Sequence, residues 1–98
     1  MLDKLTHQDF QACLNHKVQI TYGGGTLEVE LIACRTLAAS RRNDASREPF
    51  SLIFRGPRVP ILPQGTYPFV GGPADGLEIF IVPVGPDEAG MRYEVIFT

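Results

Sequence analysis

The chain has 98 residues and a formal net charge of -2 at pH 7, so it has the size of one domain. Its hydrophobic fraction of 44% is that of a globular protein, and its small net charge gives no general reason to expect nucleic acid or an anionic membrane as partner. There is no secretory leader pattern and no apolar stretch of membrane-spanning length, so we expect a cytoplasmic protein.

The first predicted element is a short helix over about residues 6–15. Thr6 followed by Asp9 is typical of an N-cap with an acid at the third helical position. We expect the helix to cover one open end of a sheet. Its apolar face consists of three residues at helical spacing, Phe10, Cys13 and Leu14.

Short segments of alternating apolar and polar residues follow the helix, and we interpret them as strands. The glycines at 23–25 predict a hairpin turn between the first two, with Ala33 on the inner face of the second strand. Pro83 predicts an edge or a bulge in the fifth strand. The predicted strands span about residues 17–22, 26–36, 49–55, 65–70, 77–84 and 91–97.

The third strand organises the predicted sheet, because Phe50, Leu52 and Phe54 share one face and make it a core face. No helical pattern lies between the strands, so short turns join them and the pairing is antiparallel. About six short strands with apolar residues on both faces predict a mainly β domain, either a small antiparallel barrel or a two-layer sandwich.

Four blocks carry a resemblance to a family: PFSLIFRGP at 49–57, LPQGTY at 62–67, LEIFIVPVG at 77–85 and YEVIF at 93–97. Together with Phe10 in the N-terminal helix, they resemble a small bacterial domain family of unknown function, whose members are often encoded near phage tail-collar-like proteins. The resemblance implies an accessory or assembly role and no catalytic residue. Members usually carry a histidine after the second block, where this chain has Val70-Gly71-Gly72, so no site is carried over from there.

The sequence offers little catalytic chemistry. His7 and His16 do not have the spacing of a zinc pair, so we expect no metal site and no cofactor. Cys13 and His16 could act as nucleophile and base, but a helical cysteine on an apolar stripe is more often a core residue. Both cysteines, Cys13 and Cys34, are expected to be reduced thiols, and the chain is expected not to be an enzyme.

The uneven placement of charge suggests interaction surfaces, since the middle third is basic and the last quarter is acidic. Solvated loops and strand faces also explain these charges, and nucleic-acid binding is disfavoured. We therefore expect a protein-interaction or assembly domain whose partner is itself or a neighbouring gene product, and no membrane contact. The alternative is a small-ligand-binding barrel with a mouth near Tyr22 and Tyr67. The candidate interaction residues are Arg41, Arg42, Arg47, Arg55 and Arg58.

Overall fold

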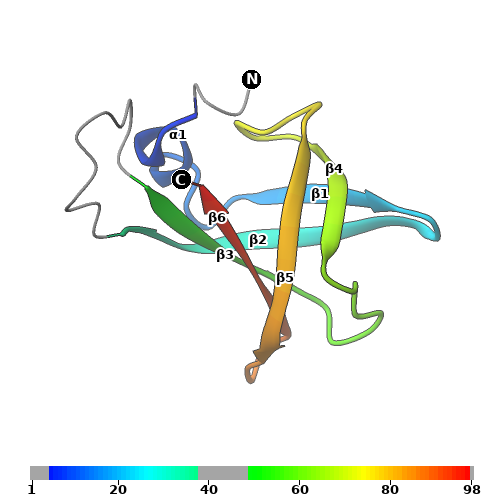
Figure 1. The fold of residues 1–98 in the computed structure, drawn as a ribbon. Coiled ribbons are helices and arrows are strands. Elements are labelled where there is room, and N and C mark those ends of the chain that lie inside the picture. Colours follow the sequence, from blue (N-terminus) through cyan, green and yellow to red (C-terminus); the bar gives the residue numbers. More distant parts are fainter. Residues whose placement is uncertain (1–4, 38–48, 98) are drawn as a thin grey trace.

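A computed structural model of the chain describes residues 5–37 and 49–97 (Figure 1). The strands form a closed antiparallel barrel in the order β1-β2-β3-β6-β5-β4, so the barrel prediction is confirmed over the sandwich. No helix in the described part of the chain has the length and apolar character needed to cross a membrane. The elements are α1 (His7–Gln11), β1 (Lys17–Tyr22), β2 (Gly25–Thr36), β3 (Phe50–Gly56), β4 (Gly65–Val70), β5 (Glu78–Pro86) and β6 (Met91–Phe97).

The predicted cap of α1 is confirmed as a capping box. The Thr6 backbone N–H donates to the Asp9 carboxylate at 3.0 Å, and the Asp9 N–H donates to the Thr6 hydroxyl at 3.4 Å. The helix is shorter than the predicted 6–15, because regular hydrogen bonding stops at Gln11 and a turn follows. Asn15 ends that turn in a left-handed conformation with φ 70°, as asparagine does more readily than most residues.

A β-bulge in β2 overturns the prediction for Ala33. The register of β2 on β3 shifts between Leu31, which pairs with Phe54, and Ala33, which pairs with Ile53. The extra residue reverses the alternation, since side chains change face at every position of a strand. Ala33 therefore lies on the outer face. Cys34 instead packs against the core.

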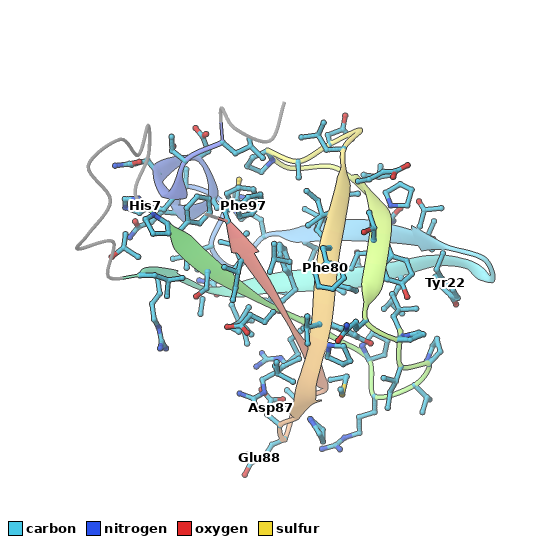
Figure 2. All side chains as sticks on the ribbon, viewed as in Figure 1. His7, Tyr22, Phe80, Asp87, Glu88 and Phe97 are labelled. Atoms are coloured by element: carbon cyan, nitrogen blue, oxygen red, sulfur yellow. The ribbon has the colours of Figure 1, made fainter. Side chains whose placement is uncertain are left out.

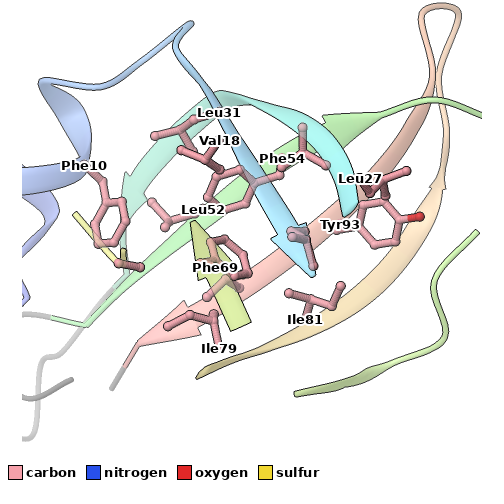
Figure 3. Packing of buried hydrophobic residues seen from close by; sticks show 14 of the residues in the cluster. Phe10, Val18, Leu27, Leu31, Leu52, Phe54, Phe69, Ile79, Ile81 and Tyr93 are labelled. Atoms are coloured by element: carbon pink, nitrogen blue, oxygen red, sulfur yellow. The ribbon is translucent and has the colours of Figure 1, made fainter. Parts of the chain in front are cut away.

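The interior of the barrel is filled by side chains from every strand and from α1 (Figure 3). One end is closed by α1, whose Phe10 packs against Phe50 and Phe97 with ring centroids 5.8 and 5.6 Å away. Phe50 and Phe97 stack on each other at 4.8 Å. The helix therefore covers an open end of the sheet, as predicted. The largest side chains with less than 2% exposure are Tyr93, Phe50, Ile20, Leu31, Leu52, Ile81 and Val29.

A second contact holds the link between β3 and β4, residues 57–64, against the barrel. The fully buried Tyr93 of β6 accepts a hydrogen bond through its hydroxyl from the Leu62 N–H at 3.0 Å. Leu62 itself is 3% exposed, although the residues on either side of it are exposed. One buried leucine and one buried hydroxyl therefore hold an otherwise exposed segment against the barrel.

The hairpin of β1 and β2 extends beyond the neighbouring strands only at its tip, residues 21–26 (Figure 1), which we call the arm, because Leu27 and Val29 are buried in the core. Its predicted glycine turn is confirmed, with Tyr22 paired to Gly25 across the tip. The ladder between β2 and β3 ends at Glu30 and Arg55, so residues 25–29 of β2 pair with β1 alone among the described strands. The molecule is correspondingly elongated, with extents of 41 × 28 × 23 Å.

Replacing Phe10 by alanine should destabilise the domain by about 3 kcal/mol, the low end for a buried phenylalanine, because α1 can relax over the cavity. Urea unfolding measures the free energy. As the control, Gln11→Ala on the exposed side of the same helix should change it by less than about 0.5 kcal/mol. Equal effects of the two variants would show that Phe10 does not anchor the helix.

Replacing Tyr93 by phenylalanine should destabilise the domain by about 1–3 kcal/mol, because the buried Leu62 N–H loses its acceptor. Hydrogen exchange of the Leu62 amide should accelerate in the variant, which distinguishes release of the link from a general loss of stability. A Leu62 amide that stays as protected as in the wild type, relative to the core, would contradict this account.

Candidate functional site

Two of the predicted interaction arginines meet an acidic residue of the last quarter of the chain. The Arg55 guanidinium forms an ion pair with the Asp87 carboxylate, with Nη1 and Oδ2 3.0 Å apart. Arg58 donates to the Asp87 backbone carbonyl at 2.6 Å. Part of the charge asymmetry is therefore compensated within the fold. The other three predicted residues, Arg41, Arg42 and Arg47, lie outside the described residues.

Asp87 also organises the turn between β5 and β6 (Figure 2). Its second carboxylate oxygen accepts the backbone N–H groups of Ala89 and Gly90, both at 2.9 Å. Desolvation works to raise the pKa of Asp87, but the hydrogen bonds from Ala89, Arg55 and Gly90 and the charge of Arg55 outweigh it, so its pKa is lowered. A side chain at Gly90 would collide with the carbonyl oxygen of Gly56, so the turn packs tightly against the end of β3.

Beside this ion pair lies an open groove of about 240 Å³, at the end of the ladder between β2 and β3. Arg55 is already engaged by Asp87, and Glu30 faces Arg55 across the β2–β3 ladder. The arrangement suits electrostatic recognition of a charged partner. The groove is lined by Lys17, Glu28, Glu30, Arg55, Pro57 and Ala89, among others.

The structure places Tyr22 and Tyr67, the predicted ligand mouth, on neighbouring strands of the barrel. Tyr22 follows Ile20 by two residues and Tyr67 precedes Phe69 by two, and Ile20 and Phe69 are paired between the two strands. Both rings pack against the core, and the Tyr67 hydroxyl donates to the carbonyl of Pro63 at 2.6 Å. A ligand at this mouth stays a prediction.

A narrow apolar crevice of about 10 Å³ lies beneath α1, which is room for one water molecule. Cys13 and His16 both line it, but no carboxylate does, so the third member of a nucleophile–base–acid arrangement is missing there. The other cysteine, Cys34, donates its thiol to the His7 carbonyl at 3.5 Å, and burial raises its pKa. Within the described residues, no three His, Cys, Asp or Glu side chains gather closely enough to hold a metal ion.

The outer face of the barrel has an apolar strip to which the sequence patterns assign no function. Phe80 and Val84 of β5 are 51% and 40% exposed, and Ile96 of β6 is 54% exposed. Val82 lies between the first two and pairs with Glu94 of β6, which precedes Ile96 by two residues. Figure 2 shows Phe80 projecting from the outer side of β5. We call Phe80, Val82, Val84 and Ile96 the outer strip. The sequence signal for it is the presence of large apolar residues at both parities of β5.

Comparison with known proteins places the chain in a family. A family model described as a domain of unknown function (DUF6916) matches residues 5–97. The chain belongs to the DUF6916 family. The resemblance to a domain family of unknown function is thereby confirmed. No curated protein and no solved structure matches the chain.

Replacing Arg55 by glutamine should raise the pKa of Asp87 towards its ordinary value, because a hydrogen bond and a charge that favour the carboxylate are both weakened. Carboxyl carbon shifts followed by NMR during a pH titration measure the pKa. Arg92→Gln is the control, since Arg92 is not among the causes of the shift. An unchanged Asp87 pKa in Arg55→Gln would contradict the role of this ion pair.

Stability should depend on pH through the same group. The folded-state pKa of Asp87 is below its unfolded value, so the ionised carboxylate contributes its full stabilisation above the unfolded pKa and loses it as pH falls through the folded pKa. The stability difference between the wild type and Asp87→Asn should therefore be constant near neutral pH and shrink below the ordinary pKa of an aspartate. Urea unfolding at a series of pH values checks this, and a difference independent of acid pH would contradict it.

Proposed function

We propose that this domain is a non-enzymatic protein-interaction module that serves as an assembly accessory, linked to a tail-like structure as the family resemblance implies. The partner is another copy of the chain or the product of a neighbouring gene. The observation that carries the proposal is the outer strip, which places Phe80 and Ile96 half-exposed on the outside of the barrel.

Burying exposed aromatic and branched apolar side chains of this kind against another protein is favourable in free energy, because it removes apolar surface from water. Isolated apolar residues on a surface are normal, but Phe80, Val82 and Val84 follow one another along the same face of β5. A half-exposed phenylalanine presents a rigid apolar ring, which is a residue type enriched at protein interfaces. The outer strip thus supports a docking function better than it supports any reaction.

The alternative of a small-ligand-binding barrel has weaker support. Inward side chains fill the barrel, and the crevice beneath α1 has the size of one water molecule. Drug-sized ligands occupy pockets of several hundred cubic ångströms with apolar walls and a few polar groups. The groove beside the ion pair has volume, but its lining is largely charged and it is open to solvent. It therefore fits a charged surface of a partner better than an enclosed small ligand.

Replacing Phe80 by serine should abolish association while leaving the fold intact. The side chain is half-exposed, so the expected change in unfolding free energy is within about 0.5–1 kcal/mol. Light scattering over a range of protein concentrations and capture of neighbouring gene products measure the association. Val59→Thr is a matched control, because Val59 is 76% exposed and lies outside the outer strip.

A wild-type domain that remains monomeric at all concentrations and captures none of those gene products would overturn the proposed function. Equal losses in Phe80→Ser and Val59→Thr would show that association does not proceed through the outer strip. Association that survives Phe80→Ser but fails in a variant of the groove, such as Glu28→Lys, would move the interface to the other side of the barrel.

A further inference from the structure

The outer strip has opposite charges at its two ends. Along β5, Glu78 precedes Phe80 by two residues and Phe80 precedes Val82 by two, so the three side chains share the outer face. At the other end, Arg92 of β6 pairs with Gly85 of β5. Arg92 lies on the same outer face, since the residues before and after it are buried. The surface therefore runs from a carboxylate through apolar side chains to a guanidinium.

Both end charges are available to a partner. Glu78 is exposed, and no ion pair engages it within the described residues. Arg92 donates its Nε–H to the Gly85 carbonyl at 3.3 Å, and among the described residues the N–H groups of its two terminal nitrogens have no acceptor. Arg55 pairs with Arg92 in the ladder but is engaged by Asp87, so Arg92 supplies the free positive charge at this end.

This pattern of charge is self-complementary for a second copy of the chain. In a two-fold dimer the same surface is used twice, so each feature meets its counterpart on the other copy. An axis that crosses β5 between Phe80 and Val82 makes the two β5 strands antiparallel and packs each Phe80 on the other copy's Val82. Each Glu78 then lies at the level of the other copy's Arg92, where opposite charges attract.

The other orientation of the same two faces is disfavoured. With the axis along β5, the two strands would be parallel, and Glu78 would face Glu78 while Arg92 lay beside Arg92. Like charges brought together at an interface suppress that arrangement. Glu94, the carboxylate beside Val82, belongs to β6, so it lies at the side of the contact between the two β5 strands. The charges therefore select one arrangement of two copies.

We propose that two copies of the chain associate face to face through the outer strip, with two-fold symmetry and with Glu78 of each copy beside Arg92 of the other. The inference rests on the proposed function, because it takes the outer strip as the docking surface. It adds the identity of the partner and its orientation. The outside of a barrel is convex, so the contact is small, and we expect a dissociation constant on the order of tens of micromolar.

Charge reversal tests the orientation, because a two-fold interface contains the Glu78–Arg92 contact twice. Glu78→Arg alone and Arg92→Glu alone each turn both contacts from attractive to repulsive. Each variant should self-associate on the order of tenfold more weakly than the wild type. An equimolar mixture of the two variants should regain association close to that of the wild type, since both contacts of the mixed dimer again join an arginine to a glutamate. Sedimentation equilibrium measures each dissociation constant.

Controls separate the designed contact from general effects of charge and folding. Glu28→Lys makes the same change of charge as Glu78→Arg but lies in the groove, and it should associate like the wild type. Urea unfolding checks that each variant is folded. A second measurement needs no variant and covers the case in which Arg92→Glu does not fold. In a mixture of isotopically labelled and unlabelled wild type, intermolecular NOEs should join the Phe80 ring to the Val82 methyl groups.

The outcomes distinguish this inference from the proposed function. A mixture of the two variants that associates no more tightly than either variant alone would overturn the two-fold arrangement. A wild-type dimer without NOEs between Phe80 and Val82 would do the same. A wild type that stays monomeric but captures a neighbouring gene product through Phe80 would overturn the second copy and leave the proposed function standing. A monomer that captures nothing would overturn both.

Discussion

The structure depends on β3 being paired on both sides while its inner face is buried completely. β2 and β6 bond to its two edges along nearly its whole length. Phe50, Leu52 and Phe54 are each at most 2% exposed, so the strand contributes a continuous apolar row to the interior. Burial of a large apolar side chain contributes about 1.5–3 kcal/mol, which makes this row the main source of cohesion in a domain without disulfides among its described residues. The other strands close the barrel around it.

Because the interior is packed, the features open to partners lie on the outside and at strand ends. Phe10 closes one end of the barrel, and Tyr93 with Leu62 ties the link over another part of it. Charge accordingly concentrates where strands end, around the ion pair of Arg55 and Asp87 and the groove beside it. Apolar surface remains on the outer strip. The groove and the outer strip thus give the barrel two chemically different surfaces, one charged and one apolar.

Most elements could be predicted because turn chemistry and alternation are local. The capping box of Thr6 and the glycine turn of the arm involve residues a few positions apart, and Pro83 correctly indicated the bulge in β5 next to Gly85. The bulge in β2 contains no glycine or proline that would mark it in the sequence. The prediction therefore continued the alternation of inward and outward side chains through the bulge and placed Ala33 on the wrong face. Arg55 was a candidate for interaction, but its partner Asp87 lies 32 residues away, and no local pattern joins them.

The sequence by itself determined the strands, the antiparallel class and the identity of the core, since each follows from the alternation of side chains along an extended chain. The sequence also resembles a domain family of unknown function, and the family match confirms that resemblance. Only the tertiary structure decided that the sheet closes into a barrel and that β2 extends beyond the end of its ladder with β3. Those facts depend on register between segments far apart in the chain. Register is set by how whole strands pack together, and no single segment encodes it.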